Sequence, residues 1–286
     1  MRILQDFELS FQRELKSIYD NDEIKSIFLL VVEELLGIKR IAYQLNKGDS
    51  VSETDSVRFL DILQDLKKSR PIQYILNRAD FYGELFEVNE SVLIPRQETE
   101  ELVDLIIKTH TDSSGLKVID IGTGSGCIPI ILSKYLNEAK VTTVDISKEA
   151  IHTAQKNAQR LGQPVHFINA DILEWDYIFS DQQYDIIVSN PPYITPKEKQ
   201  QMQQNVLDYE PELALFIEES APLIFYDVIS SFALKHLVPD GDLYFEINQY
   251  LGFETKDLIE KKGFQQVQLI KDIHGADRII HAKKKA

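Results

Sequence analysis

Val118-Ile119-Asp120-Ile121-Gly122-Thr123-Gly124-Ser125-Gly126-Cys127 joins a short apolar run to a loop with three glycines. The apolar run is typical of a buried strand, and helical spacing of apolar residues resumes after the loop. Small residues between a strand and a helix N-terminus allow a ligand to approach the backbone, so the stretch predicts a nucleotide or nucleoside cradle. The candidate cofactor-binding residues of this loop are Gly122, Thr123, Gly124, Ser125 and Gly126.

The spacing of the glycines restricts the ligand. The pattern is Gly-x-Gly-x-Gly, and Cys127 stands where a dinucleotide fingerprint has its third glycine. No Gly-Lys-Ser/Thr follows, so the loop is not a P-loop. A pyrophosphate-binding loop is therefore disfavoured.

Strand and helix patterns alternate on both sides of the glycine loop, which predicts a doubly wound, mostly parallel α/β sheet. The strands are expected at 118–121, 141–144, 165–168, 185–189, 243–247 and 265–270. The helices are expected at 97–109, 128–135, 148–161, 221–237 and 250–261. The basic tail Lys283-Lys284-Lys285 is expected to be a frayed terminus.

Acidic residues end the two strands that follow the glycine loop. Asp145 lies 23 residues after Gly122, where a carboxylate can accept hydrogen bonds from a ribose diol. Asp171, which ends the next strand, could meet the exocyclic amine of adenine, and Ile172 beside it is included in the candidate cofactor site. Either acid alone could be a turn residue. Together with the glycine loop, they predict a site for an adenosyl ligand without phosphates.

The strand 185–189 ends abruptly in Asn190-Pro191-Pro192-Tyr193. Neither proline can continue a strand ladder, and a residue before proline is extended, so a rigid turn is expected where α/β sheets bind ligands. The Asn190 side chain and the Pro191 carbonyl could hold a planar amide or amine, and the ring of Tyr193 could stack on it. We therefore assign Asn190, Pro191 and Tyr193 as candidate catalytic residues. All four residues are candidates for substrate binding, and Asn190 also for cofactor binding.

The chain before the sheet has two different patterns. Residues 1–75 show apolar residues at helical spacing, with Gly37 as a helix stop and a third helix starting near Ser52. We expect a small helical bundle that serves as a substrate-docking domain. Residues 76–95 alternate apolar and polar residues around Asn89-Glu90, which predicts a β-hairpin linker. Residues 96–286 form the remaining domain.

Two further segments have alternative interpretations. Arg96, Glu98, Thr99 and Glu100 crowd the start of the helix 97–109, either as a cap and solvated turn or as one wall of the active site. The polar segment 195–204 is long enough to be a lid or a substrate loop.

Composition excludes several classes of protein. The 286 residues suffice for two domains, with 43% hydrophobic and 27% charged residues. No apolar run approaches the length of a membrane span, no secretory signal is evident, and the single cysteine permits neither an internal disulfide nor a zinc cluster, so a cytoplasmic protein without a metal site is expected. The net charge of −15 disfavours a nucleic-acid substrate.

The glycine loop, the two acids and Asn190-Pro191-Pro192-Tyr193 together resemble a class I S-adenosylmethionine-dependent methyltransferase with a Rossmann-like fold. Four further stretches resemble one family within that class, the peptide chain release factor glutamine methyltransferases. These stretches are residues 70–75 (RPIQYI), 81–83 (FYG), 93–100 (LIPRQETE) and 209–211 (YEP). The similarity is specific from about Arg70 onward.

This resemblance implies transfer of a methyl group from S-adenosylmethionine to N5 of the glutamine in the Gly-Gly-Gln motif of a release factor, with S-adenosylhomocysteine as the other product. An alternative is an adenine-N6 or guanine-N2 nucleic-acid methyltransferase, because the same turn can hold the amine of a base. A non-catalytic adenosyl-binding scaffold is a second alternative, although a scaffold gives no reason for a rigid amide-accepting turn. No membrane partner is expected.

Overall fold

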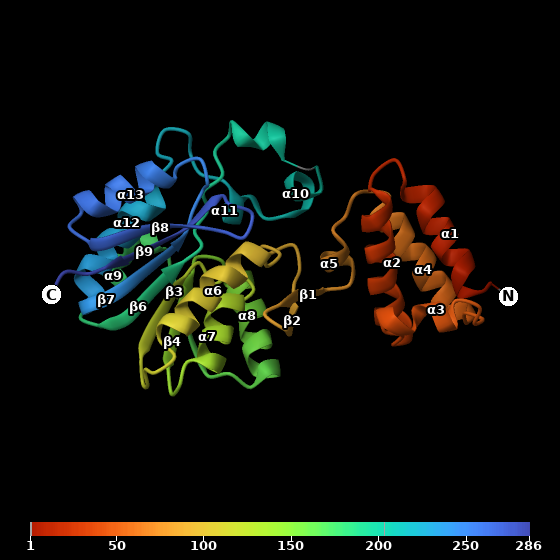
Figure 1. Cartoon of the computed structure of the whole chain (residues 1–286), viewed down its shortest axis with the longest axis horizontal. Helices are drawn as coiled ribbons and strands as arrows, with labels where there is room; N and C mark the ends of the chain where they lie inside the picture. The colour runs from red at the N-terminus through yellow and green to blue at the C-terminus, as the bar shows by residue number, and fades with distance from the viewer. Residues whose placement is uncertain (1, 203) are drawn as a thin grey trace. The chain divides into compact units, whose positions relative to one another are not determined.

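The computed structural model describes residues 2–202 and 204–286. They form two compact units (Figure 1). The first comprises residues 2–77 and 204–209, and the second comprises residues 78–202 and 210–286. Among the described residues, no helix combines the length and apolarity that crossing a membrane requires.

The first unit is the expected helical bundle. Its helices are α1 (Leu4–Leu15), α2 (Asn21–Leu36), η1 (Arg40–Ala42), α3 (Tyr43–Asn46), α4 (Glu53–Leu66), α5 (Ile72–Ile75) and α10 (Gln204–Tyr209). The side chain of Asp20 caps α2, and Ser52 caps α4 as its position predicts. Gly37 ends α2 in the left-handed conformation with φ of 68°, which confirms the predicted stop.

Aromatic side chains fill the centre of this bundle. The rings of Phe7 and Phe59 stack with centroids 4.8 Å apart, and Phe28 packs edge-on against Phe11 and Tyr43. All five side chains are buried. The hydroxyl of Tyr209, at the end of α10, donates to the Lys68 carbonyl over 3.0 Å. Residues 204–209 therefore belong to the helical unit although they lie far from it in sequence.

The second unit contains the predicted doubly wound sheet, in the strand order β5-β4-β3-β6-β7-β9-β8. The strands are β3 (Lys117–Ile121), β4 (Lys140–Asp145), β5 (Val165–Asn169), β6 (Tyr184–Ser189), β7 (Leu237–Glu246), β8 (Gln265–Lys271) and β9 (Asp277–Lys283). Strands β3 to β7 pair in parallel, and β9 pairs antiparallel to both β7 and β8. The fold class expected from the alternating pattern is confirmed.

Helices cover both faces of this sheet (Figure 1). On one face lie α6 (Gln97–Thr109), α7 (Cys127–Tyr135) and α8 (Lys148–Leu161), and on the other lie α9 (Trp175–Ile178), α12 (Ile224–His236) and α13 (Gly252–Lys261). Successive residues of β6 alternate between the two cores: Ile186 and Val188 pack on one side and Ile187 on the other. All three are fully buried, as the continuous apolar run requires.

The strand order places two loops side by side. From β3 the chain proceeds to β4 and β5 in one direction, and β6 then returns to the other side of β3. The carboxyl ends of β3 and β6 are therefore neighbours at the point where the order reverses, where such sheets bind ligands. A Cβ on Gly122 would lie 3.6 Å from the Asn190 carbonyl oxygen. The glycine loop and the Asn-Pro-Pro-Tyr turn meet there.

The hairpin exists, but its predicted turn is wrong. Strands β1 (Arg78–Phe81) and β2 (Glu84–Glu87) turn at Tyr82-Gly83, with φ of 51° and 75°, and not at Asn89-Glu90. Two positive φ values suit a two-residue hairpin turn, but tyrosine at the first position hides that signal in the sequence. Asn157 of α8 holds β2 by accepting from the Glu87 nitrogen at 2.7 Å and donating to the Glu87 carbonyl at 2.9 Å.

The predicted frayed tail is also wrong for its first two lysines. Lys283 is the last residue of β9, and its ammonium lies 3.0 Å from a carboxylate oxygen of Asp242. The backbone nitrogen of Lys284 donates to the Gly241 carbonyl at 2.9 Å. The sequence does not predict strand β9, because Arg278, His281 and Lys283 interrupt its apolar residues and because the compensating charge of Asp242 lies on the partner strand β7.

Three short helices complete the second unit. Two of them are η2 (Ile172–Glu174), which follows β5, and α11 (Glu212–Leu215). The polar segment 195–204, for which a lid and a substrate loop are the two interpretations, contains η3 (Glu198–Gln201) before the chain enters α10. Ile194 and Phe216 form a parallel bridge, so the segments before and after this excursion are paired.

Candidate active site

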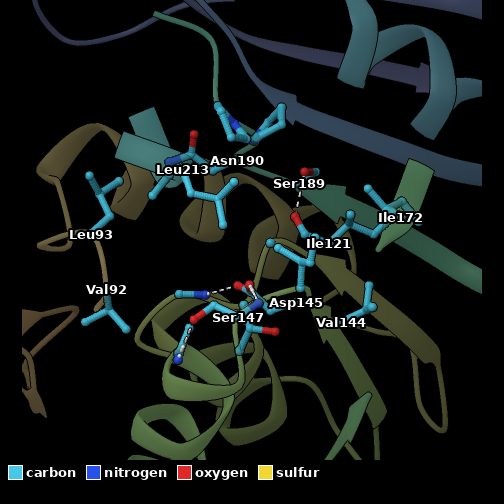
Figure 2. A pocket seen from close by; sticks show the side chains of 18 of the residues that line it. Val92, Leu93, Ile121, Val144, Asp145, Ser147, Ile172, Ser189, Asn190 and Leu213 are labelled. Carbon is cyan, nitrogen blue, oxygen red and sulfur yellow. Dashed lines mark hydrogen bonds between the residues drawn. The ribbon is translucent and has the colours of Figure 1, made fainter. Parts of the chain in front are cut away.

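A cavity of about 350 Å³ opens at the carboxyl ends of β3, β4 and β6. Figure 2 shows Asn190 and Leu213 on one side of it and Asp145 and Ser147 on the other. Most of its lining is apolar, with a few polar groups, as in sites for small ligands and cofactors. All lining residues belong to the second unit.

The glycine loop contributes four of its five candidate residues to the cavity wall: Gly122, Thr123, Gly124 and Ser125. Gly126 is not among the described lining residues. Its φ is 83°, and a Cβ at this position would lie 2.8 Å from Ile130 Cδ1 and 2.9 Å from Ala154 Cβ. Gly126 therefore allows α7 and α8 to pack closely, so its role in ligand binding would be indirect.

A chain of hydrogen bonds between side chains connects the glycine loop to strands β3 and β4. The Thr143 hydroxyl donates to Asp120 Oδ2 at 2.7 Å, and the Thr123 hydroxyl lies 2.7 Å from that of Thr143. Asp120 is completely buried, and this burial raises its pKa to about 8 although the Thr143 hydrogen bond opposes the rise. The other oxygen of Asp120 has no hydrogen-bond partner in the part of the chain that the structure describes.

Asp145 lies at the end of β4 and lines the cavity. Its Oδ2 accepts from the Gly124 nitrogen at 3.0 Å, and its Oδ1 accepts from the Ser147 nitrogen at 2.9 Å (Figure 2). Burial raises the pKa of Asp145, and these backbone hydrogen bonds partly offset the rise. Each carboxylate oxygen has a second lone pair, so the group can still accept hydrogen bonds from a diol.

Asp171 and Ile172 also line the cavity, at the start of η2. Asp171 Oδ1 accepts from the Leu173 nitrogen at 2.9 Å and so caps this short helix. Ile172 is 8% exposed and packs with Val144 and Ile121, so the wall beside Asp171 is apolar. An apolar slot with an acceptor at its edge suits a flat heteroaromatic ring that carries an amine.

Asn190, Pro191 and Pro192 line the opposite side of the cavity. The Asn190 side-chain nitrogen donates to the Thr99 hydroxyl at 3.2 Å. The hydroxyl of Ser189, the preceding residue, donates to the Ile121 carbonyl at 2.6 Å and ties the end of β6 to β3 (Figure 2). The turn is thus anchored to the sheet on one side and to α6 on the other.

The ring of Tyr193 is not among the described residues that line the cavity. It packs on the core around α12, and its hydroxyl donates to Glu246 Oε1 at 3.1 Å. Burial and the neighbouring Glu246 charge raise the Tyr193 pKa far above that of a free phenol, so it is a neutral donor at physiological pH. The structure therefore brings Asn190, Pro191 and Pro192 to the cavity, and Tyr193 to the layer behind it.

The start of α6 is part of the wall, which was one of the two alternatives. Arg96 and Thr99 line the cavity, whereas Glu98 and Glu100 are not among the described lining residues. Glu100 instead accepts from the Tyr82 nitrogen at 2.8 Å and holds the hairpin.

The apolar residues of the cavity wall could not be predicted from the sequence, because nothing in their spacing distinguishes them from core residues. They come from the segment before α6, from α11 and from α12, and they are Val92, Leu93, Leu213, Ala214, Phe225 and Ile229. Buried Glu246, which bonds both Thr99 and Tyr193, was also missed. An acidic residue inside an apolar strand was the available signal for it.

The cavity fits S-adenosylmethionine by its donor and acceptor groups. Asp145 offers acceptors for a ribose, Asp171 and Ile172 offer an edge acceptor and an apolar slot for adenine, and the glycine loop exposes backbone beside them. Arg96 is the only cationic side chain among the described lining residues, and the Gly-x-Gly-x-Gly spacing already disfavours a pyrophosphate.

Two family models match this chain. One, described as a methyltransferase domain, matches residues 112–268, and the other, described as the PrmC N-terminal domain, matches residues 10–76. Curated relatives named release factor glutamine methyltransferase are similar over nearly their whole lengths. The one from Flavobacterium psychrophilum is 45% identical over 97% of this chain and 98% of its own, and the one from Bacteroides thetaiotaomicron is 44% identical over 96% and 97%.

Solved structures show the same methyltransferase fold at low identity. A methyltransferase from Pyrococcus furiosus has a TM-score of 0.52 at 18% identity and covers 82% of this chain and 100% of its own. The T. thermophilus 16S rRNA N2 G1207 methyltransferase, in complex with AdoMet and guanosine, has a TM-score of 0.52 at 18% identity over 73% of this chain and 50% of its own. These similarities establish the fold and not the substrate.

Proposed function

Because this chain belongs to the release factor glutamine methyltransferase family, we propose that it methylates N5 of the glutamine in the Gly-Gly-Gln motif of a peptide chain release factor. The observation that carries the proposal is the position of Asn190, Pro191 and Pro192 on the cavity wall opposite Asp145. The turn proposed to bind the amide thereby faces the residues proposed to bind the cofactor across one cavity. The proposal implies a cytoplasmic protein, since translation terminates there.

S-adenosylmethionine supplies an electrophilic methyl group when it is bound. The residues that we propose to bind it are those predicted from the sequence. Gly122, Thr123, Gly124 and Ser125 would present backbone, Asp145 would accept from the ribose, and Asp171 with Ile172 would hold the adenine. Gly126 would act through helix packing.

Asn190 and Pro191 would orient the glutamine. A carboxamide nitrogen is a poor nucleophile because its lone pair is delocalised into its carbonyl. The Asn190 side-chain oxygen and the Pro191 carbonyl can accept its two hydrogens, which would fix the plane of the amide and so direct the nitrogen's lone pair, which is perpendicular to that plane, into the cavity. Correct placement in a site shielded from water can account for large accelerations, with effective molarities of about 10⁵ M or more.

A nucleic-acid substrate is the weaker alternative. The same turn could hold the exocyclic amine of a base, and a ribosomal RNA methyltransferase shares the fold. However, the chain carries a net charge of −15, and binding to a phosphate backbone gains its affinity from lysine and arginine.

We also propose that the helical unit docks the release factor. Ile41 and Leu45 lie close in sequence on η1 and α3, and they are 90% and 88% exposed. Replacing both with aspartate should raise KM for whole release factor about tenfold and leave KM for a short Gly-Gly-Gln peptide unchanged. Equal effects on both acceptors would contradict docking by this surface.

To test the proposed function, the purified protein is incubated with labelled S-adenosylmethionine and, in separate reactions, with each of two acceptors. The acceptors are a bacterial release factor and its variant with Gln→Ala in the Gly-Gly-Gln motif. Mass spectrometry of the loop peptide should find one added methyl group on the wild-type acceptor only. Ribosomal RNA and DNA are offered in parallel reactions, and transfer to either, with none to the loop, would show that the substrate class is wrong.

A further inference from the structure

Four side chains form a continuous chain of hydrogen bonds that begins at the cavity wall, with Asn190 and Thr99, and continues behind it. Asn190 Nδ2 donates to Thr99 Oγ1 at 3.2 Å, and the Thr99 hydroxyl donates to Glu246 Oε2 at 2.6 Å. The hydroxyl of Tyr193 donates to the second oxygen, Glu246 Oε1, at 3.1 Å. Thr99 is 3% exposed and Glu246 is 1% exposed, so water does not compete for these groups. The chain connects α6, β7 and the turn after β6.

The order of donors in this chain follows from the chemistry of Glu246. Both oxygens of Glu246 accept from hydroxyl groups, those of Thr99 and Tyr193. Burial raises the pKa of Glu246, whereas these two hydrogen bonds and the positive charge of Arg278 of β9 oppose the rise and favour the ionised form, which only accepts hydrogen bonds. The single hydroxyl proton of Thr99 is used on Glu246, so Thr99 can only accept from Asn190. Asn190 must therefore turn its NH2 group toward Thr99, and its oxygen toward the other side.

We propose that Thr99 and Glu246 are positioning residues that fix which end of the Asn190 carboxamide faces the substrate, with Tyr193 holding the second oxygen of Glu246. This inference rests on the proposed function, because it concerns the binding of an amide that donates hydrogen bonds. The carboxamide of asparagine has nearly the same shape after a 180° flip, so packing alone does not select its orientation. The chain of hydrogen bonds does select it.

The orientation decides which ligand group the turn can accept. With the oxygen of Asn190 toward the substrate, the site accepts the N–H groups of a glutamine side chain. In the flipped orientation it would present its own N–H groups to those of the glutamine, and both sets of donors would lack partners. The arrangement also explains why Tyr193 can matter for the reaction although its ring lies behind the wall.

Thr99→Val and Glu246→Gln test the two links separately. Valine has nearly the shape of threonine but accepts no hydrogen bond. Glutamine at position 246 can donate to Thr99, which would free the threonine proton for Asn190 and permit the flipped orientation. Thr99→Ser keeps the hydroxyl and serves as the conservative rescue. Thr109→Val, an exposed threonine of the same helix whose hydroxyl donates to the Leu105 carbonyl and which is not among the described residues that line the cavity, is the matched control.

Kinetics with whole release factor should separate positioning from support of the fold. Thr99→Val and Glu246→Gln should lower kcat about tenfold or more, since each disturbs a buried hydrogen bond, while affinity for S-adenosylhomocysteine changes less than about threefold. Thr99→Ser should recover most of the lost kcat, and Thr109→Val should match the wild type. Folded Thr99→Val and Glu246→Gln with kcat within about threefold of the wild type would overturn the inference.

A second readout does not depend on activity. In protein labelled with ¹⁵N-asparagine, the Asn190 side-chain NH2 signals are assigned by their loss in Asn190→Ala. They should exchange slowly with water in the wild type and in Thr109→Val, and shift and exchange faster in Thr99→Val and Glu246→Gln. Unchanged Asn190 signals in both variants overturn the inference even if the wild type proves inactive on release factor. Inactivity of the wild type together with the expected signals overturns only the proposed function.

Discussion

The Glu210 carboxylate lies 2.5 Å from the Arg96 guanidinium and also accepts from the Ile94 nitrogen at 3.3 Å. Glu210 is 5% exposed, and it joins the segment before α11 to the segment before α6. Arg96 and Pro211, the residue after Glu210, both line the cavity. The ion pair therefore closes one wall of the site by connecting two segments that are distant in sequence.

Removing one member of this ion pair should lower the free energy of unfolding more than removing both charges. Arg96→Met keeps the length of the side chain but leaves Glu210 buried without its cation, and should lower the free energy of unfolding by on the order of 2 kcal/mol, less than for a fully buried pair because Arg96 is partly exposed. Arg96→Met with Glu210→Gln should recover part of that loss. Urea unfolding of both single variants and the double variant measures the coupling, and additive effects would contradict it.

Two glycines of the same loop should respond differently to alanine. Both have positive φ, but a Cβ at Gly124 meets nothing within 4 Å, whereas a Cβ at Gly126 collides with Ile130 and Ala154. Gly124→Ala should therefore cost about 1–2 kcal/mol of unfolding free energy from backbone strain alone. Gly126→Ala should cost about 2–5 kcal/mol, because overpacking adds to the strain. If chemical denaturation shows equal losses of unfolding free energy for the two variants, then α7 and α8 can move apart to accommodate the Cβ without a loss of stability.

Much of the fold could be predicted from the sequence because its signals are local. The apolar runs such as Ile186 to Val188 and the caps Ser52 and Gly37 depend on residues next to one another. The strand ends also located Asp145, Asp171 and Asn190, since parallel strands that end at one edge bring their last residues together.

What the sequence did not reveal depends on distant partners. Glu246 is identifiable as part of the site only when β7 lies beside β6, and the bond between Glu210 and Arg96 joins residues 114 positions apart. The strand β9 depends on Asp242 to offset Lys283. The role expected for the Tyr193 ring followed from its position in the motif, whereas the direction of its side chain is set by Glu246.

Asp145→Asn should weaken cofactor binding more than catalysis. Asparagine has one acceptor oxygen, so it cannot hold the nitrogens of Gly124 and Ser147 and also accept twice from a diol. The Kd for S-adenosylhomocysteine, measured by calorimetry, should rise about 10- to 100-fold, as for one or two lost charge-assisted hydrogen bonds. Glu149→Gln, which removes a charge from an exposed residue of the same wall, is the control. An equal rise in both variants would indicate a general effect of charge.

Asp120 should make the protein less stable as pH rises toward 8. Burial raises the pKa of its carboxyl group to about 8 in the folded protein, against about 3.9 in an unfolded chain. Between these values the folded state retains a proton that the unfolded state has lost. A rise in pH therefore favours unfolding, by up to about 1.4 kcal/mol per pH unit from this group.

Asp120→Asn should remove this dependence, because asparagine resembles the protonated acid and can still accept from Thr143. The free energy of unfolding of the variant minus that of the wild type should grow steadily between about pH 5 and pH 8 and then level off. Urea unfolding across this range, in one buffer system at constant ionic strength, gives the difference at each pH. A constant difference would show that Asp120 is ionised in the folded protein throughout, and that the Thr143 hydrogen bond outweighs the cost of its burial.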